Sequence, residues 1–206
     1  MTVQGFPWCQ DSREIGAGSL TAKHLCTSHN GRLSSTDSAA LTLFKEFRDR
    51  FDLGAAPSMN PTDIDGNSLE RWFLKTGISM WLIGEKKPRW PSFYREGVVP
   101  FALAKTAFGE HRMTKPCGLY FYNQAGYEMD SFDGVFFDSL TEADDRILGF
   151  SYRFRGHPIL LWLDHTPVDN CILPDGLSGR GFQYRPDLIN LTRGGAPFRS
   201  IKLTWN

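Results

Sequence analysis

A cysteine and a histidine separated by two residues are the first candidates for chemistry in this sequence. The run LCTSHNGRLSSTD contains Cys26, His29 and, directly after the histidine, Asn30. Zinc binds thiolate and imidazole ligands in tetrahedral geometry, and a C-x-x-H turn that leads into a helix supplies two of the four ligands. His24 lies nearby and Cys9 stands alone in PWCQD. No second closely spaced pair occurs, so the alternative is a buried thiol and a histidine in a turn.

The segment from Glu85 to Arg95 is a second candidate, because it mixes cations with aromatic residues. Lysine and arginine neutralise phosphates while aromatic rings stack on bases, so the segment could bind single-stranded nucleic acid. The alternative is a solvated loop whose aromatic side chains anchor it to the core. The candidate nucleic-acid-binding residues are Lys86, Lys87, Arg89, Trp90 and Arg95.

Two further pairs of residues have simpler interpretations. His111 and Cys117, in the run GEHRMTKPCG, could act as a base and a nucleophile, but a polar loop is the better interpretation because no second residue is in view to orient the histidine. Asp164 and His165 are adjacent at the end of a predicted strand, where neighbouring side chains point to opposite faces. They therefore make a poor catalytic pair, and capping of the strand end is the expected role.

Helical patterns dominate the first part of the chain. After an irregular segment over residues 1–34, a Ser/Thr/Asp cluster predicts a helix that starts at Ser35 or Thr36. Its predicted buried stripe consists of Leu41, Phe44, Phe47 and Phe51. Residues 53–67 carry prolines and glycines and predict a loop. A second helix, capped by Asn67 or Ser68, is apolar on most sides and should lie centrally in the core.

The second part of the chain has the pattern of antiparallel strands. GLYFYN, GVFFDSL and ILGFSYRFRGHPILLWLD are short, aromatic and branched, and SIKLTWN could add a final strand. Their alternation predicts a sheet with one buried face. The order predicts an α+β fold: an irregular N-terminal segment and two helices, then an antiparallel β-rich half. We expect a single domain over 1–206, with a helical part at 1–84 and a β-rich part at 85–206.

Composition limits the class of protein. The chain has 206 residues, of which 41% are hydrophobic and 14% aromatic, which is enough for one sizeable core. Lys plus Arg and Asp plus Glu both number 23, so no overall charge draws the protein to nucleic acid. No signal-peptide pattern occurs, and no stretch reaches the roughly 18 apolar residues of a membrane span. We expect a cytoplasmic protein with no membrane partner and four unligated thiols.

The run KHLCTSHNGRLSSTDSAALTLFKEF, followed by NSLERWFLKTGISM, resembles uncharacterised bacterial proteins related to HNH-type endonucleases. In these proteins a treble-clef-like C-x-x-C-N or C-x-x-H-N turn precedes a helix. The resemblance covers roughly residues 20–83 and does not extend to the β-rich half. It implies that Cys26 and His29 match positions that bind structural metal, and that Asn30 matches the asparagine that follows them.

The sequence departs from the pattern of an HNH nuclease in ways that bear on function. In such an enzyme one histidine activates water, while a second histidine and an Asn or Asp hold a divalent metal against the scissile phosphate. The first CxxC knuckle and the strand that carries the catalytic histidine are absent here. The resemblance therefore implies a degenerate relative.

Two functions remain open from the sequence. The first is a non-catalytic interaction or structural protein, which binds a protein partner. The alternative is a metal-dependent nuclease or nucleic-acid-binding protein, in which His29 and Asn30 are catalytic and meet a remote histidine such as His111. In that case zinc or another divalent ion would be held by Cys26, His29, His24 and Cys9. Whether the protein is an enzyme is left open.

Overall fold

The computed structural model describes residues 2–3, 11, 13–14, 31–82, 90, 99–123, 134–142, 146–170 and 178–206. These residues form three α-helices: α2 (Ser34–Phe51), α3 (Gly66–Leu82) and α4 (Phe101–Ala107). They also form ten strands: β1 (Thr2–Val3), β2 (Arg13–Glu14), β3 (Thr62–Asp65), β4 (Gly118–Tyr122), β5 (Val135–Thr141), β6 (Ile147–Phe154), β7 (His157–Trp162), β8 (Phe182–Tyr184), β9 (Leu188–Arg193) and β10 (Ala196–Thr204). The fold is α+β, as the sequence predicts, although α4 was not predicted.

The larger sheet contains seven strands in the order β2-β1-β5-β6-β7-β4-β8. Its centre is an antiparallel run in which β5 pairs with β6, β6 with β7 and β7 with β4. The turn between β6 and β7 is formed by Arg155 and Gly156, with φ values of 49° and 80°. Two residues with positive φ match the right-handed twist of the flanking strands, which is why this short hairpin connection is favoured. The strands predicted from GLYFYN, GVFFDSL and ILGFSYRFRGHPILLWLD are confirmed.

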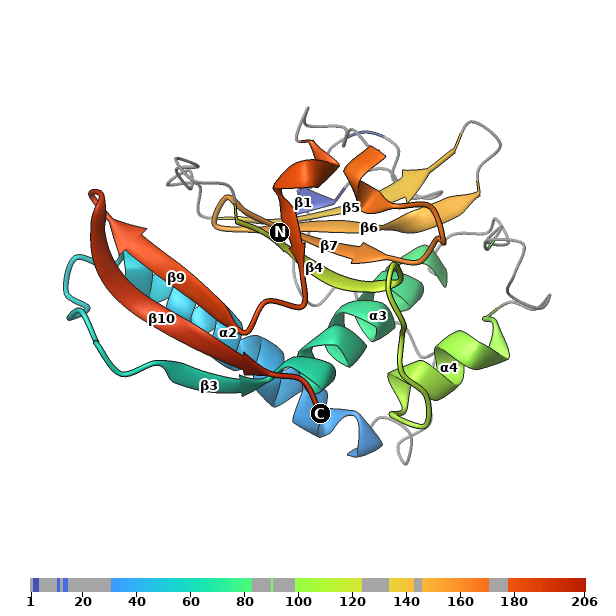
Figure 1. Ribbon diagram of the computed structural model, residues 1–206, viewed down its shortest axis with the longest axis horizontal. Helices are drawn as coiled ribbons and strands as arrows, with labels where there is room; N and C mark the ends of the chain where they lie inside the picture. The colour runs from blue at the N-terminus through green and yellow to red at the C-terminus, as the bar shows by residue number, and fades with distance from the viewer. Residues whose placement is uncertain are drawn as a thin grey trace.

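A second, three-stranded sheet has the order β3-β10-β9. It lies beside α2, to the left of the large sheet in Figure 1. The hairpin of β9 and β10 confirms the predicted final strand and extends it toward the N-terminus. The prediction of a loop over residues 53–67 is wrong in part, because β3 pairs in parallel with β10. That pairing joins segments far apart in sequence, so no local pattern reveals it.

The buried side of α2 differs from the predicted stripe. Leu41 is 69% exposed, whereas Ala40, Leu43 and Phe47 are buried. Two carboxylates on this side, Glu46 and Asp49, are buried as well. They are accommodated because both accept hydrogen bonds of 2.9 Å from Nη1 of Arg199 in β10. The helix therefore packs with a partly polar side against the small sheet, and Leu41 is turned away from that contact.

Helix α3 lies across the large sheet and occupies the centre of the core, as predicted (Figure 1). It begins at Gly66, and its N-terminal amide at Asn67 is bound by Oδ1 of Asp65 at 3.0 Å, so the predicted caps are wrong. Gly77 permits the close approach to β6, because a Cβ there would lie 2.3 Å from Cδ2 of Phe150. The hydroxyl of Tyr152 donates to the carbonyl of Phe73 at 2.6 Å and fixes the same contact.

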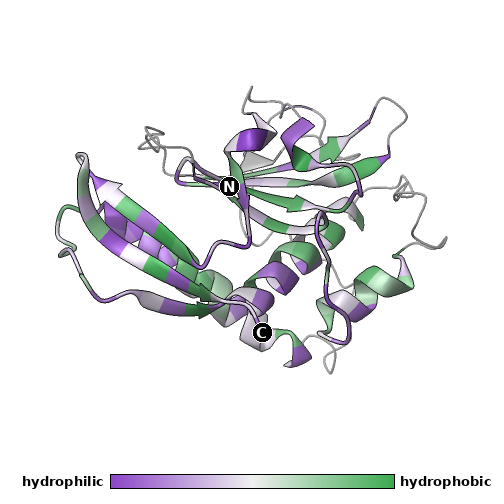
Figure 2. Ribbon diagram, viewed as in Figure 1, coloured by the Kyte–Doolittle hydropathy of each residue, from purple (hydrophilic) through white to green (hydrophobic). Residues whose placement is uncertain are grey.

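Both faces of the large sheet are covered, so the prediction of a single buried face is wrong. Leu119 and Phe121 in β4 belong to the main core cluster with α2 and α3, whereas Tyr120 and Tyr122 belong to a second cluster on the opposite face. Figure 2 shows hydrophobic residues along the inner strands and mixed residues on the small sheet. Among the described residues, no helix has the length and apolar character needed to cross a lipid bilayer.

Candidate functional site

Most of the predicted site residues lie outside the described part of the chain. This applies to Cys9, His24, Cys26, His29, Asn30, Lys86, Lys87, Arg89 and Arg95. Their roles stay predictions. Trp90 is described: it is partly buried and packs against the main core cluster, which suits an aromatic anchor. Within the described residues, no group of three or more His, Cys, Asp or Glu side chains is arranged to hold a metal ion.

The structure pairs Cys117 with a different histidine from the one considered in the sequence. The Sγ atom of Cys117 lies 3.9 Å from Nδ1 of His165 and 3.4 Å from the carbonyl oxygen of Asp164, to which it donates. His111 lies elsewhere, in a polar pocket described below. The thiol itself is 5% exposed. It is held by a backbone acceptor in a closed position, which fits a structural role better than that of a nucleophile.

Asp164 caps the end of β7, as predicted. Its Oδ2 accepts hydrogen bonds from the amide and hydroxyl of Thr166, at 3.3 and 2.6 Å. Its Oδ1 accepts from Nη1 of Arg146 at 3.0 Å. Burial by itself would raise the pKa of Asp164, but the hydrogen bonds from Thr166 and the charge of Arg146 hold that pKa below its usual value. The carboxylate of Asp164 therefore stabilises the turn that follows β7.

A buried ion pair joins α3 to the large sheet. Glu70 is 3% exposed, and its two carboxylate oxygens accept from Nε and Nη2 of Arg185 at 3.0 and 2.7 Å. Oε2 also accepts from the amide of Leu119 at 2.9 Å, and the guanidinium donates to the carbonyl of Met113 at 2.9 Å. All four contacts bind groups of the protein itself. The pair is a structural link between α3, β4 and the segment after β8.

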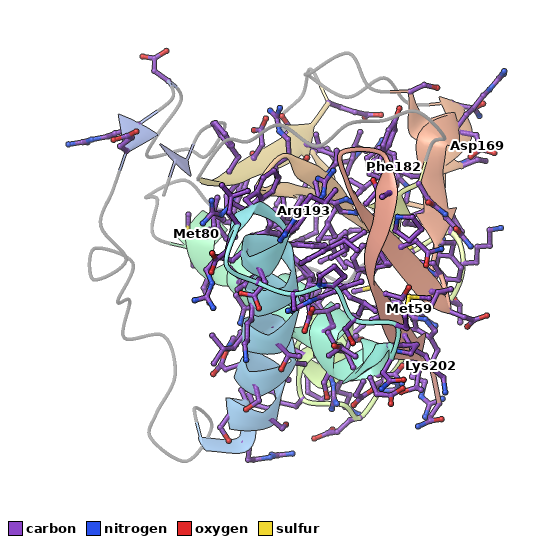
Figure 3. All side chains as sticks on the ribbon, turned by 90° about the vertical axis from the view of Figure 1, so that its left-hand side faces the viewer. Met59, Met80, Asp169, Phe182, Arg193 and Lys202 are labelled. Carbon is purple, nitrogen blue, oxygen red and sulfur yellow. The ribbon has the colours of Figure 1, made fainter. Side chains whose placement is uncertain are left out.

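The C-terminal end of α2 is bound by an arginine from the small sheet. Arg193 donates to four carbonyl oxygens, those of Asp49, Arg50, Asp52 and Ala55, at 2.6 to 3.1 Å. Figure 3 labels Arg193 beside this end of the helix. A cation is favourable there because the last carbonyls of a helix are unsatisfied and carry partial negative charge. Arg193, like Arg185, therefore binds groups of the protein itself and has a structural role.

A polar pocket of about 230 Å³ lies at the start of α3. Its lining includes Asp65, Glu70, Arg71, His111 and Arg112. Glu70 is bound to Arg185, and Arg71 donates to the carbonyl of residue 67 and to the hydroxyl of residue 68. His111 and Arg112 are exposed and make no hydrogen bond or ion pair with the described residues. The pocket thus offers two side chains, His111 and Arg112, that can donate hydrogen bonds to a ligand. The carboxylates beside them are already hydrogen-bonded within the protein.

A second hollow, of about 450 Å³, lies between α2 and the β5–β6 hairpin. We call it the α2–β6 groove. Its lining residues are Leu41, Phe44, Lys45, Phe47, Arg48, Gly134, Val135, Phe154 and Arg155. Most of the side chains are aromatic or aliphatic, with a few cationic groups among them, which is the usual composition of a site for a small organic ligand.

The apolar part of the groove is built by packing between helix and sheet. Phe44 and Phe154 approach with ring centroids 4.2 Å apart, and Phe47 and Phe154 are buried. Behind Phe47 lies the ring of His157, at 4.9 Å between centroids. Burial, assisted by the charge of Arg50, lowers the pKa of His157 to about 3, so this imidazole is neutral at neutral pH. The imidazole behind Phe47 therefore adds no charge to the groove.

The cations of the groove differ in how far the protein satisfies them. Lys45 is exposed and makes no hydrogen bond or ion pair with the part of the chain that the structure describes. Arg48 contacts Oδ1 of Asp49 at 3.1 Å but keeps its side chain 59% exposed. Asp49 also binds Arg199, so two arginines share that carboxylate. Positive charge in the groove exceeds the negative charge that the described residues supply.

Sequence reasoning missed this groove, although part of its signal was present. Leu41, Phe44, Lys45 and Arg48 fall three, four and seven positions apart and share one face of α2. Two cations on the same face as two apolar residues indicate a face that is not fully covered by the core. The contribution of Phe154 and Arg155 is visible only once the β-rich half packs against α2.

Comparison of the chain with known protein families, with curated proteins and with solved structures finds no match. A function is therefore inferred from the geometry of these residues.

Proposed function

We propose that this protein is a non-catalytic interaction protein on a scaffold related to the HNH endonucleases, and that it binds its partner or ligand through the α2–β6 groove. The observation that carries the proposal is the groove itself: an apolar hollow of about 450 Å³ with a lysine that the described residues leave unbound. A cytoplasmic location is part of the same proposal. The relation to HNH endonucleases rests on the Cys26-x-x-His29-Asn30 turn.

The use of the buried carboxylates supports this function. Hydrolytic sites need carboxylates or imidazoles that are free to hold a metal or move a proton. Glu46, Asp49, Glu70 and Asp164 are the acidic residues buried in the described structure, and each is bound by arginine. These groups stabilise the fold. The unoccupied cation, by contrast, lies beside apolar surface, where it suits binding.

The test is a cleavage assay on the full chain, purified without chelator. Supercoiled plasmid is incubated with the protein in the presence of Mg²⁺, Mn²⁺ or Zn²⁺, and metal content is measured on the same sample by elemental mass spectrometry. We expect no nicking above a buffer control under any of the three conditions. Nicking that disappears in a His29→Ala variant with unchanged circular dichroism would contradict the proposal.

A second candidate, a metal-dependent nuclease or nucleic-acid-binding protein, is favoured by one observation. His111 and Arg112 are adjacent in sequence and both line the polar pocket. Both are exposed, and neither is bound by the described residues. Such donors suit a phosphate group. The corresponding test is fluorescence anisotropy with a labelled single-stranded oligonucleotide. Under this alternative, binding weakens in an Arg112→Met variant and falls steeply with salt; under our proposal, the oligonucleotide does not bind.

A further inference from the structure

We propose that the α2–β6 groove binds a medium-chain aliphatic carboxylate, with the aliphatic chain against Leu41, Phe44 and Phe154 and the carboxylate at Lys45. This inference rests on the proposed function and specifies the chemistry of the ligand.

The apolar part of the ligand follows from the lining. Leu41 is 69% exposed, although it stands next to buried residues of the same helix. Phe44 and Val135 are partly buried, and Phe154 closes the base of the groove at 2% exposure. An exposed leucine beside partly buried apolar side chains in a hollow favours an apolar occupant, because removing its surface from water is the main gain on binding. The occupant therefore needs an aliphatic or aromatic body.

The acidic group of the ligand follows from charge complementarity. Lys45 is one turn beyond Leu41 on the same face of α2, and Arg48 is less than one turn further. Lys45 makes no ion pair with the described residues, and Asp49, the carboxylate that Arg48 contacts, is shared with Arg199. Arg155 lines the groove on the sheet side. A carboxylate at Lys45 would form a charge-assisted hydrogen bond at the edge of the apolar surface.

The size of the groove distinguishes a small ligand from a protein partner. A standard protein interface uses about 20–30 residues on each side, whereas nine residues line this groove. Its volume of about 450 Å³ falls within the roughly 300–1,000 Å³ that is typical of small-molecule sites. A carboxylate with a chain of intermediate length fills such a space and reaches the lysine from within it.

The experiment is isothermal titration calorimetry of the delipidated full chain with sodium dodecanoate, kept below its critical micelle concentration. We expect saturable binding of one dodecanoate per chain. Affinity should rise from octanoate through decanoate to dodecanoate, by about twofold to fourfold for each methylene that enters the groove. Dodecanol and dodecyltrimethylammonium share the chain without the anion, and we expect both to bind at least several-fold more weakly.

Matched variants locate the site. Lys45→Met keeps the length of the side chain and removes its charge, and we expect it to weaken dodecanoate binding about fivefold. Leu41→Gln preserves helix-forming tendency and removes apolar surface, with an expected loss of about tenfold. The controls are Lys202→Met, at an exposed lysine on the small sheet that Figure 3 labels away from Arg193, and Leu53→Gln, at a leucine that is 92% exposed. Both controls should bind as the wild type does.

Four results would overturn the inference. They are an absence of dodecanoate binding, equal binding of dodecyltrimethylammonium, equal losses in the control variants, and binding of an acidic amphipathic peptide in place of dodecanoate. A dimer in size-exclusion chromatography that Leu41→Gln converts to a monomer would instead assign the groove to a second copy. These outcomes are separate from plasmid cleavage, so the ligand assignment can fail while the non-catalytic function stands, and the reverse also holds.

Discussion

The link between Glu70 and Arg185 and the groove around Lys45 show two different uses of charge in the same fold. At the first, four hydrogen bonds within the protein engage a buried glutamate and a largely buried arginine. At the second, a lysine stands beside an apolar hollow and makes no ion pair with the described residues. The difference indicates that charges in the core stabilise the fold, whereas the charge at the groove is available for a ligand. Four predictions test this distinction.

The largest effect is expected from Glu70→Gln. The change leaves Arg185 without its carboxylate in a buried site, and breaking such a pair costs about 3–5 kcal/mol of unfolding free energy. Urea denaturation followed by circular dichroism measures the loss. The matched control is Asp63→Asn, which breaks the pair with Lys202 in which both side chains are exposed; it should change stability by less than about 1 kcal/mol. A loss for Glu70→Gln as small as the control's would contradict a structural role.

A smaller effect is expected from Arg193→Met. The variant removes the donors to four carbonyls at the end of α2 and the stacking on Phe198, whose ring centroid lies 3.7 Å from the guanidinium carbon. We expect a loss of about 2 kcal/mol in unfolding free energy. Arg180→Met, at an exposed arginine, serves as the control in the same denaturation experiment. Equal stability of the two variants would show that the hydrogen bonds from Arg193 do not hold α2 to the small sheet.

His157, which lies behind the groove, should make the free energy of unfolding depend on pH. Its pKa falls from 6.5 to about 3 on folding, so below pH 6.5 the unfolded chain binds a proton that the folded chain does not. Stability should therefore decrease as the pH falls from 6.5 toward 3, by up to about 1.4 kcal/mol per pH unit. Denaturation at several pH values should give a flatter profile for His157→Gln than for the wild type. Parallel profiles would mean that this imidazole is not the titrating group.

The smallest effect on stability is expected at Lys45. Because this side chain is exposed and unbound by the described residues, Lys45→Met should change the unfolding free energy by no more than about 0.5 kcal/mol. The same urea denaturation serves for this variant. A loss comparable with that of Arg193→Met would show that Lys45 stabilises the fold. The distinction between structural charges and a charge available for a ligand would then not hold.

The parts of the fold that depend on local pattern could be predicted from the sequence. The alternating aromatic strands of the large sheet and the apolar helix α3 follow from periodicity. Strand β3 could not be predicted, because residues 62–65 gain their pairing from β10 at the other end of the chain. The buried side of α2 was mispredicted for a similar reason: Arg199, distant in sequence, makes burial of Glu46 and Asp49 favourable.

The candidate site was harder to predict than the fold. The groove requires α2 to meet the β5–β6 hairpin, and neither segment alone indicates a hollow. The availability of Lys45 also depends on the fold, since Glu46, the next residue, is bound by Arg199 from β10. A sequence shows which residues are charged, but their neighbours in space decide which charges remain available. The zinc and nuclease residues predicted around His29 lie outside the described structure and stay predictions.

The most direct test joins stability to binding in one measurement. Urea unfolding of the wild type and of Lys45→Met is followed with and without dodecanoate, because a ligand that binds the folded state raises the free energy of unfolding. Without dodecanoate we predict equal stability. With dodecanoate at about ten times its dissociation constant, the wild type should gain about 1.4 kcal/mol and the variant clearly less. Equal gains in both proteins, or none in either, would contradict the assignment of the groove as the binding site.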